Sequence, residues 1–130
     1  MTGPDRELID SFEAGTLDPA AFHHGDHVRL AWLHLRRYPP PVALERFTSG
    51  LRRLAAAAGK ADRYHETVTW AYLLLINERM ERSGRDLAWT EFARLNPELL
   101  TWRPSILEAY YPPEVLASDL ARRVFVLPRG

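Results

Sequence analysis

Four of the five histidines fall in two short segments that also carry acidic residues. The members are His23, His24, Asp26 and His27 in the first segment, and His65 and Glu66 in the second. Imidazole is the commonest metal ligand in proteins and the only side chain whose ordinary pKa lies near neutrality. The two segments therefore suggest either metal binding or proton transfer at a shared site.

The spacing within the first segment favours joint ligation, because residues three or four apart share one face of a helix. His24 and His27 are three apart, and His23 and His27 are four apart. Three imidazoles, or two with a carboxylate, bind the metal in catalytic zinc sites and in many iron and copper sites. We therefore predict a site for a divalent transition metal, zinc, iron or copper. Its predicted ligands are His24, His27 and His65, with His23 and Asp26 as additional candidates.

Such a centre would activate water or oxygen for chemistry on a small-molecule substrate. Glu66 is the predicted base, and the aromatic residues predicted to shape the substrate pocket are Trp32, Trp70 and Tyr72. If the histidines converge without a metal, the expected chemistry is proton transfer by His65 paired with Glu66. Protease chemistry has no support, because the metalloprotease signature is absent: Thr69 stands where its second histidine would be.

A structural interpretation explains the same residues without a site. Asp26 would then cap a helix, His23 and His24 would be exposed turn residues, and His65 would be a polar group near a helix end. The protein would be a non-catalytic ligand-binding or protein-interaction module. A homodimer is compatible with the enzyme and with the module. His34, two turns beyond His27, is expected on the flank of its helix, packed or solvated.

Composition excludes several classes of function. The 130 residues include no cysteine, which rules out disulfides, iron–sulfur clusters, thiolate zinc sites and a catalytic thiol. Seventeen basic and seventeen acidic residues cancel, so no overall field favours nucleic acid or an anionic membrane. The acidic first twenty residues lack the apolar core of a signal peptide, and no apolar run is long enough to span a membrane. We expect a cytoplasmic protein.

The predicted elements that position these residues are all helical. The apolar spacing, prolines and glycines predict helices over 5–14, 26–38, 41–58, 62–82, 89–95, 97–100, 105–110 and 113–123. Gly25 is predicted to interrupt the chain before Asp26, and Asp62 to cap the longest helix. Residues 124–127 are predicted to be a lone extended arm. The predicted fold is all-α, a compact irregular bundle of five to seven helices in a single domain, residues 1–130.

Two phrases of the sequence resemble a group of small, uncharacterised bacterial all-helical proteins. They are Phe22-His23-His24-Gly25-Asp26-His27 and Tyr64-His65-Glu66-Thr67. The resemblance extends over most of the chain. It implies no activity, so no functional residue is carried over from it.

Overall fold

Helices make up the regular structure of residues 1–128, the part of the chain that the computed structural model describes. No β-strand occurs among these residues, which confirms the predicted all-α class. The chain divides into two units, Met1–Tyr64 and His65–Gly130. The single domain expected from the sequence stays a prediction. Within the described residues, no helix combines the length and the apolar character needed to cross a membrane.

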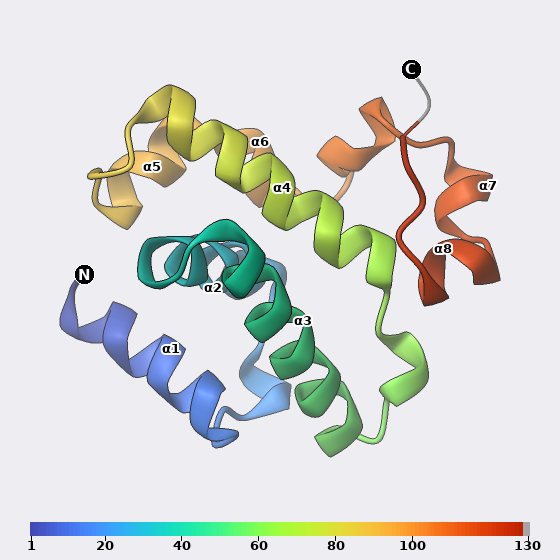
Figure 1. Ribbon diagram of the computed structural model, residues 1–130, viewed down its shortest axis with the longest axis horizontal. Helices are drawn as coiled ribbons and strands as arrows, with labels where there is room; N and C mark the ends of the chain where they lie inside the picture. Colours follow the sequence, from blue (N-terminus) through green and yellow to red (C-terminus); the bar gives the residue numbers. More distant parts are fainter. Residues whose placement is uncertain (129–130) are drawn as a thin grey trace. The chain divides into compact units, whose positions relative to one another are not determined.

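The first unit contains three α-helices and two 3₁₀ turns (Figure 1). In chain order they are α1 (Gly3–Ala14), η1 (Pro19–Ala21), α2 (His24–Arg37), α3 (Pro40–Ala57) and η2 (Ala61–Arg63). Helix α2 packs against both α1 and α3. Helix α3 begins at Pro40, because proline has the φ angle of a helix and lacks the N–H that the first turn would leave unpaired.

Two contacts tie the helices of the first unit together. Phe12 of α1 lies so close to Gly50 of α3 that a Cβ at Gly50 would be only 2.2 Å from the Phe12 ring. Glycine is therefore the residue that lets these helices approach. Between α1 and α2, the Nε–H of Arg29 donates to the carboxylate of Asp5 at 3.0 Å. Asp5 is only 1% exposed, so its negative charge must be stabilised by its hydrogen-bond and ion-pair partners instead of by water.

The start of α2 differs from the prediction. The helix begins at His24, and Gly25 lies inside its first turn. The N-cap residue is His23, whose backbone N–H donates to the Asp26 carboxylate at 3.0 Å. The predicted break at Gly25 is wrong because Asp26 closes the turn from the third helical position, as an acidic residue does in a capping box.

The second unit is built on its longest helix (Figure 1). Its elements are α4 (Glu66–Ser83), α5 (Trp89–Leu95), α6 (Pro97–Leu100), η3 (Ile106–Ala109), α7 (Pro113–Leu116) and α8 (Asp119–Arg123). Helix α4 contacts α5, η3 and α8. Residues 124–127 form neither helix nor strand, as predicted for the extended arm. Phe125 in this arm stacks on Trp70 of α4, with ring centroids 5.0 Å apart.

Candidate functional site

His27 is the histidine whose surroundings best suit a ligand. Its ring packs edge-on against Phe22, with centroids 5.0 Å apart, and lies 5.8 Å from the ring of Phe47 on α3. These contacts restrict the orientation of the imidazole. Within residues 1–128, neither ring nitrogen of His27 has a hydrogen-bond partner. The lone pair of the neutral ring is therefore not occupied by another described residue.

His24 lies one turn before His27 in the first turn of α2. Burial lowers the pKa of His27 to about 4, the nearby His24 contributes in the same direction, and the Asp26 carboxylate opposes them. His27 is consequently neutral at physiological pH. A metal ion binds imidazole in this neutral form, so the pair meets the protonation requirement for ligation.

The other two polar residues of the first segment have different roles. His23 projects into solvent with 79% of its side chain exposed, and its Nδ1 is 3.7 Å from an Asp26 carboxylate oxygen. That same Asp26 oxygen accepts the backbone N–H of His23. Asp26 is therefore engaged in closing the helix start, whereas the side chain of His23 is exposed and able to change rotamer.

His65 belongs to the second unit, where both of its ring nitrogens are hydrogen-bonded. Nδ1 accepts the backbone N–H of Val68 at 3.1 Å, which makes His65 the N-cap of α4. Nε2 lies 2.7 Å from the carbonyl oxygen of Leu116 and donates to it in the tautomer that the Val68 bond requires. The prediction that Asp62 caps this helix is wrong, because the imidazole supplies the acceptor. Glu66 is the first residue of α4.

Within the described part of the chain, no three His, Asp or Glu side chains are grouped as a metal ion would need. The first unit holds His23, His24, Asp26 and His27, and the second holds His65 and Glu66. The predicted site shared by the two segments therefore stays a prediction. His24 and His27 are the pair that the structure brings within electrostatic reach.

The three aromatic residues predicted to shape a pocket have structural contacts. Trp32 is 2% exposed, and the guanidinium of Arg36 lies 5.0 Å from the centre of its ring. Trp70 stacks on Phe125, and the hydroxyl of Tyr72 is hydrogen-bonded to the Ser105 hydroxyl at 2.8 Å. Their role in binding a substrate stays a prediction.

His34, expected on the flank of its helix as a packed or solvated residue, lies in the core. The ring is fully buried, and its Nδ1 donates to the Leu30 carbonyl oxygen at 2.7 Å. Among the described residues nothing hydrogen-bonds to its Nε2. Burial lowers the pKa of His34, although the bond to Leu30 and the nearby Glu13 act in the opposite direction. The signal for its burial is the spacing of seven from His27, since both rings face Phe47.

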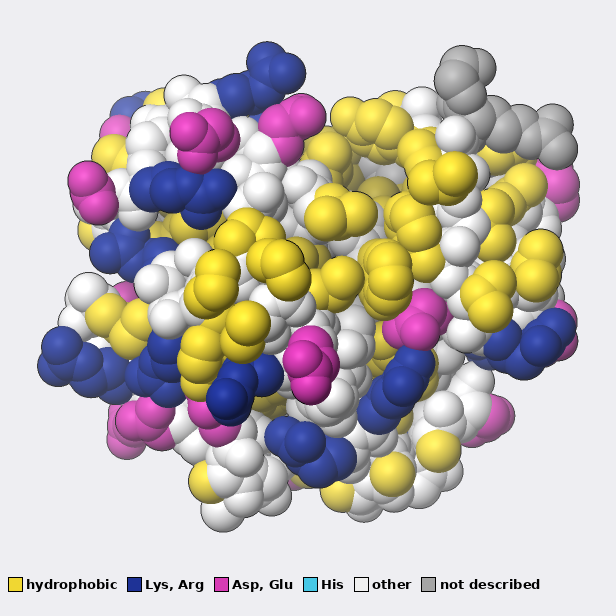
Figure 2. All heavy atoms as spheres, in the orientation of Figure 1, with side chains coloured by type: hydrophobic (Ala, Val, Ile, Leu, Met, Phe, Trp, Pro, Cys, Tyr) yellow, Lys and Arg dark blue, Asp and Glu magenta, His cyan; other side chains and the backbone are white. Residues whose placement is uncertain are grey.

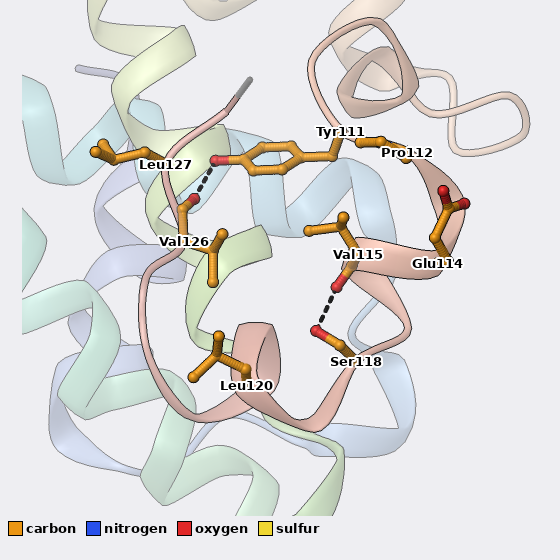
Figure 3. Close-up of a pocket in the computed structure, with 8 residues that line it drawn as sticks. All are labelled: Tyr111, Pro112, Glu114, Val115, Ser118, Leu120, Val126 and Leu127. Atoms are coloured by element: carbon orange, nitrogen blue, oxygen red, sulfur yellow. Dashed lines mark hydrogen bonds between the residues drawn. The ribbon is translucent and has the colours of Figure 1, made fainter. Parts of the chain in front are cut away.

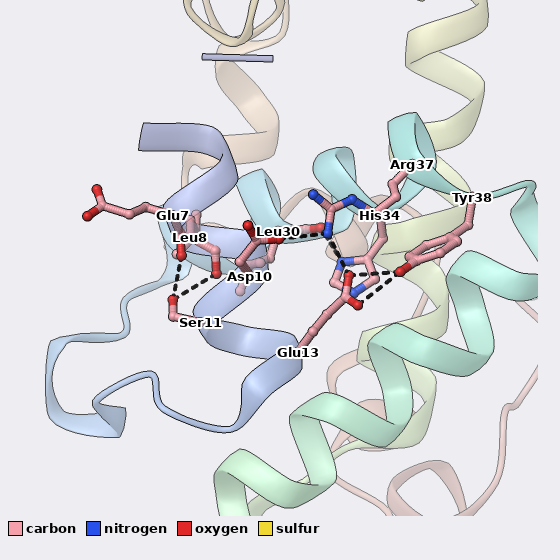
Figure 4. Close-up of polar contacts among 9 residues, drawn as sticks. All are labelled: Glu7, Leu8, Asp10, Ser11, Glu13, Leu30, His34, Arg37 and Tyr38. Atoms are coloured by element: carbon pink, nitrogen blue, oxygen red, sulfur yellow. Dashed lines mark hydrogen bonds and ion pairs between the residues drawn. The ribbon is translucent and has the colours of Figure 1, made fainter. Parts of the chain in front are cut away.

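A polar cluster lies beside His34 and ties α1 to the end of α2 (Figure 4). Glu13 points toward the end of α2, where it accepts the Tyr38 hydroxyl at 2.9 Å and the Arg37 guanidinium at 3.0 Å. Arg37 also donates to Asp10 at 2.9 Å. The hydrogen-bond donors of Arg37 and Tyr38 are thus paired with the carboxylates of Asp10 and Glu13. We therefore assign them to holding the helices together rather than to chemistry.

An apolar pocket of about 300 Å³ lies in the second unit (Figure 3). Its lining residues are Tyr111, Pro112, Glu114, Val115, Ser118, Leu120, Val126 and Leu127. The Ser118 hydroxyl donates to the Val115 carbonyl, and the Tyr111 hydroxyl donates to the Val126 carbonyl. The walls therefore offer mainly apolar contact. Figure 2 shows hydrophobic side chains around a hollow near the end of the described chain.

Comparison with known proteins adds no relative. No protein-family model matches the chain, and no curated protein and no solved structure is found to be similar to it. The resemblance based on the two histidine phrases stays a prediction.

Proposed function

We propose that the first turn of α2 binds a divalent transition metal through His24 and His27, and that the metal serves chemistry on a small-molecule substrate. The observation that carries this proposal is the state of His27. Two aromatic rings hold its imidazole, no described residue hydrogen-bonds to its nitrogens, and a second histidine lies one turn away. Zinc, copper and iron all accept imidazole ligands.

The electrostatics of the pair favour ligation over acid/base catalysis. A general base works best when its pKa lies near the working pH. Burial brings the pKa of His27 to about 4, which would make it a weak base at neutral pH. The same low pKa removes competition between protons and a metal for the ring nitrogen. A metal held there would supply Lewis acidity toward a bound water or substrate oxygen.

His23 is the proposed third ligand within the same turn. It is four residues before His27, and its exposed side chain can rotate toward that face at small energetic cost. One carboxylate oxygen of Asp26, Oδ2, already accepts the His23 N–H, so only Oδ1 would be available to a metal. Recruiting His65 would break at least one of its two ring hydrogen bonds. Glu66 belongs to the second unit, and its role as a base stays a prediction, as does the small-molecule substrate.

Titration of the metal-free chain with Zn²⁺ and with Co²⁺ tests the proposal. We expect His27→Ala and His24→Ala each to weaken binding by about tenfold or more, since even the loss of an indirect support of a metal ligand has an effect of that size. His65→Asn is the comparison variant, because asparagine retains an N-cap acceptor while removing the imidazole. We expect it to bind metal like the parent.

Circular dichroism of each variant checks that its helices are retained. The proposal is wrong if the parent takes up neither metal, or if His27→Ala binds as tightly as the parent. Loss of binding in His65→Asn would instead support the site shared by the two histidine segments.

A further inference from the structure

The imidazole of His34, on α2, lies at the junction of the three helices of the first unit. Phe12 of α1 packs edge-on against it and Phe47 of α3 packs at a tilt, each with its ring centroid 5.3 Å from that of His34. The ring is fully buried, and its Nδ1 donates to the Leu30 carbonyl oxygen. Its Nε2 therefore carries the lone pair of the neutral ring, and no described residue hydrogen-bonds to that atom. This position suits an uncharged imidazole.

Protonation would add a positive charge and a second N–H to this buried ring. Both are costly inside a protein unless a partner group compensates for them. The charged side chains that face the ring come from all three helices: Glu13 on α1, Arg37 on α2 and Arg46 on α3. Both guanidinium groups oppose a positive imidazole. Glu13 would favour one, but its carboxylate already accepts the Arg37 guanidinium and the hydroxyl of Tyr38 (Figure 4).

The hydrogen bonds that attach α1 to α2 all use carboxylates of α1. The pairs are Asp5 with Arg29, Asp10 with Arg37, and Glu13 with both Arg37 and Tyr38, the C-cap residue of α2. Among the described residues, no other group of α1 is hydrogen-bonded to α2. The pairs formed by Asp10 and Glu13 belong to the polar cluster beside His34, so a charge on the imidazole acts where α1 is attached.

We propose that His34 is a pH switch, in which protonation of its imidazole releases α1 while α2 and α3 stay packed together. Moving α1 away removes Phe12 from the ring, so that water can solvate the charge and its new N–H. Helix α3 contributes Ala43, Phe47 and Leu51 to the core. Release of α1 is enough to solvate the ring, so this apolar contact of α3 is kept. The switch uses none of the proposed metal ligands.

The direction of the switch follows from proton linkage. In the docked state burial lowers the pKa of His34, and the guanidinium groups of Arg37 and Arg46 act in the same direction. The bond to Leu30 and the Glu13 carboxylate oppose this shift of the pKa without reversing it. Once opened to water, the imidazole binds a proton near its ordinary pKa of 6.5. Below that pH the released state binds more protons than the docked state, so docking of α1 weakens as the pH falls.

Hydrogen exchange of backbone amides at pH 7.5 and pH 5 measures the release, once each rate is converted to a protection factor that removes the intrinsic pH dependence of exchange. Carboxylates ordinarily lose their charge only below this interval, so the imidazole responds first. In the parent, we expect the protection of α1 amides such as Ile9 and Phe12 to fall by up to about thirtyfold, to a level below that of α2 and α3.

Two variants assign this fall to one imidazole. His34→Leu replaces the titrating group with an apolar one at an apolar position and should abolish the fall in α1. His27→Phe is the matched control, because it removes another imidazole of α2 with a low pKa but leaves His34 in place. We expect it to keep the whole fall in α1.

The ring of His34 in the parent provides a second measurement that needs no variant. Its nitrogen-15 signals should stay those of a neutral imidazole at every pH at which α1 is protected. The signals of the cation should appear together with the loss of that protection.

The proposal is overturned if the protection of α1 is the same at both pH values, or if His34→Leu shows the same fall as the parent. It is equally overturned if the fall is smaller in His27→Phe, because α1 would then exchange only when the whole unit unfolds. A protonated His34 beneath a protected α1 would also overturn it, since the ring would then tolerate the charge without release.

Discussion

Replacing Arg29 with methionine is expected to destabilise the protein by about 3 kcal/mol, because it leaves the buried Asp5 carboxylate without its charged partner. Burial by itself would raise the pKa of Asp5, but hydrogen bonds from the Thr2 backbone and from Arg29 outweigh it and leave the pKa below its ordinary value. Methionine keeps much of the apolar volume of the arginine stem. The expected loss therefore reports on the charge and its hydrogen bonds.

Urea unfolding followed by circular dichroism at neutral pH measures this effect. Arg6→Met is the matched control, because Arg6 is exposed on α1 and the change should alter stability by less than about 0.5 kcal/mol. Adding Asp5→Leu to Arg29→Met should recover part of the stability, since removing both charges relieves the unpaired one. Equal stability of Arg29→Met and Arg6→Met would show that the ion pair does not support the first unit.

Acidification from pH 7.5 to pH 5 is expected to lower the free energy of unfolding by about 2 kcal/mol through His27 alone. The unfolded chain binds a proton at His27 near the ordinary pKa of 6.5, whereas burial in the folded protein lowers that pKa to about 4. Between these values the unfolded state binds more protons, so stability falls as the pH falls. The lowered pKa of His34 acts in the same direction.

To isolate the contribution of His27, the free energy of unfolding is measured at several pH values for the parent, His27→Phe and His23→Gln. His27→Phe should lose most of the decrease expected from His27, while His23→Gln, which changes an exposed imidazole, should retain it. The interval stops at pH 5, above the ordinary pKa of Asp and Glu, to limit the contribution of carboxylates. An identical pH dependence in His27→Phe and in the parent would contradict the burial of this ring.

The helices were predictable where proline, glycine and apolar spacing mark them. The predicted helices 5–14, 41–58 and 62–82 end just before Gly15, Gly59 and Gly84, and these three glycines have φ angles of 75°, 70° and 118°. Thr67 was not singled out, because a hydroxyl that bonds to residues 57 and 59 positions away leaves no periodic signal. Buried Asn96 was missed for the same reason, since its amide accepts the Arg79 guanidinium from another helix.

Only the relations between candidate site residues that are close in the sequence could be predicted. A spacing of three places His24 and His27 within one turn only if both are helical, and the structure places both in α2, whereas the sequence predicted a break between them at Gly25. The capping role of His65 and its bond to Leu116 depend on contacts that the sequence pattern does not encode. The low pKa of His27 likewise arises from burial, which follows from packing rather than from residue type.

Nitrogen-15 NMR of the imidazole rings during Zn²⁺ titration would show which histidines bind the metal, because it reports each ring nitrogen separately. We predict that the ring signals of His24 and His27 shift on metal binding, while those of His34 and His65 stay unchanged. Unchanged His24 and His27 signals at saturating Zn²⁺ would contradict it.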